Sequence, residues 1–114
     1  MKLEVCKPEE TYESQLDHCG QEFEELVQAL AVYRNEPTMK HRAEVLFEAL
    51  DCITCLWTFI AMLFSRAEID AGINVVNCKN YVRGYLLDQE GYNLAEAVKN
   101  TSGVLSNIPG GGDK

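Results

Sequence analysis

Basic residues are scarce in this chain. Its 114 residues include 10 Lys and Arg against 18 Asp and Glu, a formal net charge of −8. A surface that binds the nucleic-acid backbone needs clustered Lys and Arg to neutralise phosphates. The charge balance therefore argues against a nucleic-acid partner. The length allows one domain with one hydrophobic core, and a composition of 46% hydrophobic and 25% charged residues is typical of a soluble globular protein.

Long apolar runs are also missing. The longest, Cys52 to Phe64, has 13 residues, whereas a membrane-spanning helix needs about 20. The first residues contain several glutamates and no apolar stretch typical of a secretory signal. The five cysteines are an odd number in a chain without a small disulfide-rich scaffold, which favours reduced thiols. We therefore predict a cytoplasmic protein with no membrane partner.

Patterns that would bind zinc or iron are weak. Neither His18 nor His41 follows a Glu by three residues, so the Glu-x-x-His signature of di-iron helical bundles is absent. Cys52 and Cys55 form a CxxC inside an apolar stretch, where cysteines are more often small buried hydrophobes. A zinc or redox site is the alternative interpretation, but zinc would need two further ligands at suitable spacing.

Helical periodicity dominates the chain, and no strand alternation is present. We predict three main helices over about Glu9–Arg34, Thr38 to Phe64 or Ser65, and Arg66–Leu87, and a short helix over Leu94–Lys99. Thr38 and Asn93 are suited to cap the second and fourth helices. The fold class is thus an all-α helical bundle, with residues 1–102 forming the domain and residues 103–114 a flexible tail.

The second predicted helix is apolar on nearly all sides of its second half. One face carries large apolar residues: Leu46, Leu50, Ile53, Trp57, Ile60 and Phe64. The opposite face turns apolar at Cys55, Phe59 and Met62. A helix that is apolar all round is buried on both sides. In so short a chain the second neighbour is expected to be another copy, so oligomerisation should complete the bundle as a homodimer or a dimer of dimers.

Two acidic pairs stand out against this apolar background. Glu22 and Glu25 are three residues apart on the first predicted helix, and Glu48 and Asp51 are three apart on the second. Residues at this spacing lie on the same helix face. Two such helices packed side by side would bring four carboxylates together. That oxygen-rich set is suited to Mg²⁺, and also to Mn²⁺.

The two pairs resemble a known family in both order and flanks. The arrangement ExxE on a first helix and ExxD on a second, separated by a helix–loop–helix length, resembles the MazG-like all-α nucleoside triphosphate pyrophosphohydrolases. The flanking residues EFEELVQAL and EVLFEALD are similar to the family's runs, and Lys79 and Arg83 follow on the third predicted helix. The resemblance covers about Leu16 to Leu87.

The resemblance implies an enzyme that cleaves a nucleoside or deoxynucleoside triphosphate to the monophosphate and pyrophosphate, a reaction suited to house-cleaning of nucleotide pools. It implies that Lys79 and Arg83 bind the substrate's phosphates. It also implies that four catalytic residues hold Mg²⁺, namely Glu22, Glu25, Glu48 and Asp51. Metal-bound water and neutralised phosphate oxygens are what this hydrolysis requires.

Plainer interpretations of the same residues stay open. Acidic pairs at this spacing usually belong to a solvated helix face, and Lys79 and Arg83 are ordinary surface charges in many helices. Glu44 lies one turn before Glu48 and is either a second-layer residue of the site or simply exposed. The alternative function is a helical oligomerisation or adaptor module without catalysis. Release of pyrophosphate from a nucleotide with Mg²⁺ distinguishes the enzyme from the adaptor.

Overall fold

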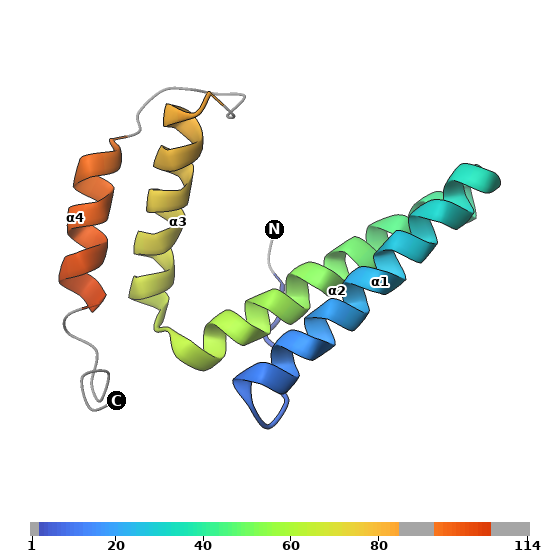
Figure 1. Ribbon diagram of the computed structural model, residues 1–114, viewed down its shortest axis with the longest axis horizontal. Helices are drawn as coiled ribbons and strands as arrows, with labels where there is room; N and C mark the ends of the chain where they lie inside the picture. The colour runs from blue at the N-terminus through green and yellow to red at the C-terminus, as the bar shows by residue number, and fades with distance from the viewer. Residues whose placement is uncertain (1–2, 85–92, 106–114) are drawn as a thin grey trace. The chain divides into compact units, whose positions relative to one another are not determined.

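The computed structural model of the chain describes residues 3–84 and 93–105, and every regular element in these ranges is a helix. The four helices are α1 Tyr12–Asn35, α2 Met39–Leu63, α3 Arg66–Val82 and α4 Leu94–Leu105 (Figure 1). Within the described ranges no residue belongs to a strand. The prediction of an all-α fold is confirmed.

The chain divides into two compact units, Met1–Leu63 and Phe64–Lys114. In the first unit, α1 and α2 pack along each other as an antiparallel hairpin (Figure 1). In the second unit, α3 packs against α4. The assignment of residues 1–102 to one domain stays a prediction, and so does the flexible tail, most of which lies outside the described residues.

Helix α1 begins at Tyr12, three residues later than the start predicted from the sequence at about Glu9. Thr11 caps it, because its Oγ1 accepts a 3.0 Å hydrogen bond from the Ser14 amide and Ser14 Oγ lies 3.1 Å from the Thr11 amide. This reciprocal pair satisfies two backbone donors at the first turn and so fixes the start of the helix. Pro8 therefore precedes the helix instead of lying in its first turn.

The cap of α2 agrees with the sequence-based prediction. Thr38 Oγ1 accepts a 3.1 Å hydrogen bond from the His41 amide. A three-residue turn, residues 36–38, separates α1 from α2. The turn is held to α1 because the Glu36 amide donates to the Val32 carbonyl at 2.9 Å. So short a connection makes the two helices antiparallel neighbours.

The interior of the first unit contains several polar groups. Gln15 is 2% exposed and Thr58 1% exposed, and Cys55 is buried beside them. Thr58 Oγ1 accepts a 3.1 Å hydrogen bond from the backbone amide of Cys6, which ties the segment before α1 to α2. Buried polar groups of this kind are tolerated because each has a hydrogen-bond partner.

The apolar stripe of α1 is exposed in the single chain. Leu16, Phe23 and Leu30 are between 42% and 60% exposed. On α2, Leu46 and Ile53 from the predicted apolar face are likewise exposed. Contiguous apolar surface of this kind usually marks an interaction site. Oligomerisation itself stays a prediction.

Helix α2 is also long and apolar enough to cross a membrane by length and composition: it has 25 residues, and an 18-residue window within it has a mean hydropathy of 1.7. The core helix of a soluble protein passes the same test, so this property is weak evidence on its own. Glu48 and Asp51 lie near the middle of α2, where ionised side chains are costly in lipid. The prediction that the protein has no membrane partner stays a prediction.

In the second unit, α3 is continuous from Arg66 to Val82. Ser65 caps it, and the Ser65 amide donates a 2.6 Å hydrogen bond to Glu68 Oε1. The helix ends at Val82, before the predicted end at Leu87, which lies outside the described residues. Gly84 follows with a φ of 74°, a conformation that suits glycine and stops a helix.

Helix α4 begins where predicted but runs past Lys99 to Leu105. The Asn93 side chain accepts a 3.0 Å hydrogen bond from the Glu96 amide, which confirms the predicted cap. Thr101 Oγ1 lies 3.1 Å from the carbonyl oxygen of Ala71, so α4 is hydrogen-bonded to α3 beyond the predicted helix end.

Candidate metal centre

Three carboxylates meet between the helices of the first unit. Glu22 and Glu25 come from α1 and Glu48 comes from α2, and one oxygen of each lies within 4.8 Å of the other two. The two α1 residues are nearly one turn apart and therefore project from one face. The antiparallel packing brings Glu48 opposite that face. The structure thus brings together three of the four residues predicted to hold a metal.

Asp51 is the exception. It is exposed and does not belong to the group of three. It lies one turn after Glu48 on α2, close enough for its charge to contribute to the raised pKa of Glu48. Asp51 is therefore at the edge of the cluster, outside the group of three but close enough to act on Glu48 by its charge.

The cluster disfavours the ionised form of Glu48. Burial is the main cause of a raised pKa at this carboxyl, and the charges of Glu25, Asp51 and Glu22 add to it, as does a hydrogen bond with Glu25. Like charges at close range oppose ionisation because each destabilises the others. A cation bound among these carboxylates would reduce this repulsion.

Two oxygens in the cluster lack hydrogen-bond partners. Glu22 Oε2 and Glu48 Oε2 are both shielded from solvent and accept no hydrogen bond. Buried acceptors without a partner are rare in native proteins and often point to an ion or a functional role. An all-oxygen set of carboxylates fits a hard divalent cation such as Mg²⁺ or Mn²⁺, which keeps several waters and needs few protein ligands.

Sequence reasoning missed one residue at this site. His18 lies one turn before Glu22 on α1, and its Nε2 is 3.1 Å from Glu22 Oε1. The signal was the four-residue spacing between them, which places both on one helix face.

The alignment of α1 against α2 is fixed by a polar contact two turns away from the carboxylates. Gln15 Nε2 donates to the carbonyl oxygen of Cys55 at 3.0 Å. Glu22 follows Gln15 by seven residues on α1, and Glu48 precedes Cys55 by seven on α2. Because the helices are antiparallel, equal spacing on both brings Glu22 level with Glu48.

The CxxC cysteines adjoin the same region. Burial raises the pKa of Cys55 to about 12, assisted by a hydrogen bond with Cys19 and by the charge of Glu22. Burial likewise raises the pKa of Cys52, and the nearby carboxylates Glu22 and Glu48 add to the shift. Thiols with raised pKa values stay protonated and unreactive at neutral pH. The interpretation as a buried hydrophobe fits Cys55, which is buried, whereas Cys52 is partly exposed.

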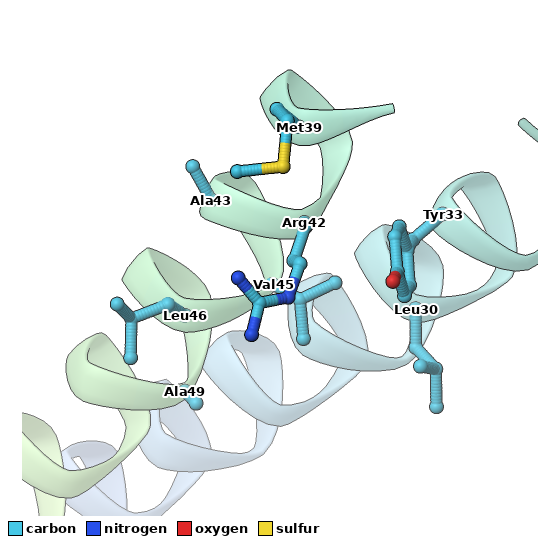
Figure 2. A pocket seen from close by; sticks show the side chains of 8 residues that line it. All are labelled: Leu30, Tyr33, Met39, Arg42, Ala43, Val45, Leu46 and Ala49. Carbon is cyan, nitrogen blue, oxygen red and sulfur yellow. The ribbon is translucent and has the colours of Figure 1, made fainter. Parts of the chain in front are cut away.

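An open pocket of about 550 Å³ lies where α1 ends and α2 begins (Figure 2). Its lining is mostly apolar and includes Leu30, Tyr33, Met39, Arg42, Ala43, Val45, Leu46 and Ala49. The guanidinium of Arg42 lies between the side chains of Val45 and Leu46 in this view, and the Tyr33 ring stands on the α1 side (Figure 2). One of these lining residues, Ala49, directly follows Glu48 in the sequence.

The two predicted phosphate ligands belong to the second unit. Lys79 is exposed in the last turn of α3, and Arg83 is exposed immediately after the helix ends at Val82. They are therefore four residues apart at the same end of α3. Their approach to the carboxylates of the first unit stays a prediction.

Comparison with protein-family models, with curated proteins and with solved structures finds no match to this chain. The resemblance to MazG-like pyrophosphohydrolases therefore rests on the residues of the two acidic motifs and their flanks, and the three-carboxylate cluster is an independent observation.

Proposed function

We propose that the protein is a Mg²⁺-dependent nucleotide pyrophosphohydrolase that cleaves a nucleoside or deoxynucleoside triphosphate to the monophosphate and pyrophosphate. The observation that supports this most is the cluster of Glu22, Glu25 and Glu48 across two helices, with two buried oxygens that accept no hydrogen bond. It contains three of the four residues of the two acidic motifs in the MazG-like resemblance. House-cleaning of nucleotide pools is the role this reaction fits.

Glu22, Glu25 and Glu48 would hold the metal, and Asp51 would complete the set from the edge of the cluster. Bound Mg²⁺ supplies neutralising charge for the phosphate oxygens and a water of lowered pKa. Mn²⁺ prefers similar oxygen ligands and is expected to substitute. The repulsion that raises the pKa of Glu48 would be relieved in the loaded state, which favours binding of the cation.

The substrate's phosphates would be bound by Lys79 and Arg83. Arg can form a bidentate contact with a phosphate, and Lys offers a compact positive charge. The apolar pocket that includes Tyr33 and Arg42 is a suitable receptor for a nucleobase, because an aromatic ring and a guanidinium both stack on planar rings. One lining residue of the pocket, Ala49, directly follows Glu48 in the sequence of α2.

A second copy of the chain is the proposed partner. The exposed apolar faces of α1 and α2, which include Phe23 and Ile53, would be covered by packing two hairpins together. The same exposed faces favour the alternative function, a helical oligomerisation or adaptor module without catalysis. The carboxylate cluster favours the enzyme, because clustered like charges cost stability unless a cation neutralises them.

The deciding experiment measures pyrophosphate release from a panel of normal and modified nucleoside triphosphates with Mg²⁺. Turnover of one class, abolished by Glu48→Gln, would support the enzyme. The thermal midpoint gives a second readout: Mg²⁺ at 100 times its Kd should add about 2.7 kcal/mol of stability to the wild type. A zinc chelator should have little effect. If the protein shows no turnover of any nucleotide and its thermal midpoint does not depend on Mg²⁺, the adaptor is the better explanation.

A further inference from the structure

His18 connects the carboxylate cluster to the segment before α1. Its Nε2 is 3.1 Å from Glu22 Oε1, and its Nδ1 is 3.6 Å from Glu9 Oε1. Glu9 is itself held in place, because its backbone amide donates a 2.9 Å hydrogen bond to the side chain of Gln15. The imidazole therefore lies between an acidic residue of the N-terminal segment and a predicted metal ligand.

The two contacts of the imidazole are not equivalent. An ionised carboxylate can only accept, so the 3.1 Å contact requires the proton on His18 Nε2. The 3.6 Å separation from Glu9 is too long for a hydrogen bond and leaves only an electrostatic interaction. The imidazole thus occupies Oε1 of Glu22, while Oε2 is buried and has no hydrogen-bond partner.

We propose that His18 is a positioning residue that orients Glu22 as a metal ligand. By binding Oε1, it restrains the Glu22 carboxylate within the cluster, while the other oxygen, Oε2, stays buried without a hydrogen bond. Repulsion from these two carboxylates would otherwise favour rotation of the Glu22 side chain away from the cluster. This inference rests on the metal site of the proposed function, and it adds a role for a residue outside both acidic motifs.

The magnitude of the effect follows from other metal sites. Hydrogen-bond partners of metal ligands fix the orientation of the ligand, and their loss typically lowers metal affinity by about 10–100-fold. The cost here falls on binding rather than on folding, because the His18 side chain is 42% exposed and lies at the surface of the hairpin. Glu22 remains present in every variant of His18. A loss of metal affinity in such a variant would therefore report a change in the orientation of the Glu22 carboxylate.

The test measures Mn²⁺ affinity by electron paramagnetic resonance in the wild type, His18→Ala, His18→Gln and His41→Ala. His18→Ala should bind Mn²⁺ about 10–100-fold more weakly with little change in thermal midpoint. His18→Gln should recover part of the affinity, because its amide nitrogen can donate to Glu22. His41 is the matched control: it also lies between two glutamates, Glu36 and Glu44, but is not hydrogen-bonded to a cluster residue.

The outcomes separate this inference from the proposed function. Wild-type affinity in His18→Ala would overturn the positioning role and leave the hydrolase intact. Weaker Mn²⁺ binding in His18→Ala, together with no pyrophosphate release by the wild type, would support the positioning role and reject the hydrolase. A wild type that binds no Mn²⁺ would overturn both. Nitrogen NMR of the imidazole at pH 8.5 adds a metal-free readout: a proton on Nδ1 instead of Nε2 would also overturn the inference.

Discussion

Gln15 and Cys55 are hydrogen-bonded across the two helices of the first unit. The Gln15 amide nitrogen donates to the Cys55 carbonyl oxygen at 3.0 Å and approaches its Sγ at 3.3 Å. The amide oxygen of the same side chain accepts a 2.9 Å hydrogen bond from the backbone of Glu9. One buried side chain therefore joins α1 to α2 and to the segment that precedes α1.

Replacing this side chain should destabilise the fold. Gln15→Ala removes the hydrogen bonds of this side chain with the Glu9 amide and the Cys55 carbonyl, which at about 0.5–1.5 kcal/mol for each bond contribute about 1–3 kcal/mol together. The free energy of unfolding, obtained from urea titration, should fall by that amount. Gln21→Ala is the matched control, because Gln21 is exposed on the same helix. Equal urea midpoints for the two variants would show that the contact contributes nothing.

Glu48→Gln should lower pyrophosphate release by at least about a hundredfold while the helical content stays unchanged. The amide keeps the shape of the carboxylate but loses the charge that recruits the metal. Glu24→Gln provides the control, since Glu24 is an exposed neighbour of the α1 motif. Wild-type turnover in Glu48→Gln would remove Glu48 from the metal site.

The same variant gives a prediction on pH. Burial and the charges of Glu25 and Asp51 raise the pKa of Glu48 above its ordinary value of 4.5. The folded state then favours the neutral form, so the stability from this group is present below pH 4.5 and is lost as the pH rises through the folded-state pKa. Without metal, Glu48→Gln should melt at a higher temperature than the wild type at pH 7, and the difference should shrink toward pH 4.5. If the difference in melting temperature between Glu48→Gln and the wild type grows on acidification, the pKa of Glu48 is not raised.

Arg83→Ala should lower kcat/KM by at least about tenfold, equivalent to roughly 1.4 kcal/mol of transition-state stabilisation. A cation near the departing pyrophosphate stabilises the charge that develops there. The thermal midpoint should change little, because Arg83 is exposed and follows the end of α3. Arg66→Ala controls for loss of an exposed arginine at the other end of α3, where Arg66 pairs with Asp70 at 3.1 Å. If Arg83→Ala melts the protein yet leaves the activity of the folded fraction unchanged, Arg83 is structural.

The purified protein should be a homodimer or larger by light scattering at micromolar concentration. Ile53 is 44% exposed on the apolar face of α2, so Ile53→Lys should shift the population toward monomer without straining the helix. Gln28→Lys adds the same charge at an exposed polar position of α1 and should leave the assembly unchanged. A stable wild-type monomer would refute the prediction and leave the apolar faces to another partner.

The features of the fold that the sequence predicts are those set by residues close together in the chain, such as helix caps. Thr38 and Asn93 were recognised as caps because a side-chain oxygen before an apolar period is a local signal. Helix ends without such a signal were less well predicted. The start of α1 depends on the reciprocal pair of Thr11 and Ser14, in which serine takes the place of the usual Glu or Gln.

The candidate site was predicted in part for the same reason. Spacing along one helix identifies the acidic pairs, but the rotation of one helix against the other decides which members meet. That rotation places Asp51 at the edge, and it depends on contacts such as the one between Gln15 and Cys55 that no periodicity reveals. The apolar stripe of α1 also shows that periodicity along one helix does not predict which face is buried. Leu16 and Phe23 repeat like residues of a core face, but both are exposed.

The equal spacing from Gln15 to Glu22 and from Glu48 to Cys55 has a consequence for changes in chain length. One residue inserted within either seven-residue segment would rotate its carboxylate by about 100° around the helix axis relative to the buried contact. Substitutions at exposed positions of these segments leave that angle unchanged. Insertions and deletions should therefore be tolerated in the turn at residues 36–38, where they do not alter either segment, and should abolish metal binding when they fall between the contact and the carboxylates.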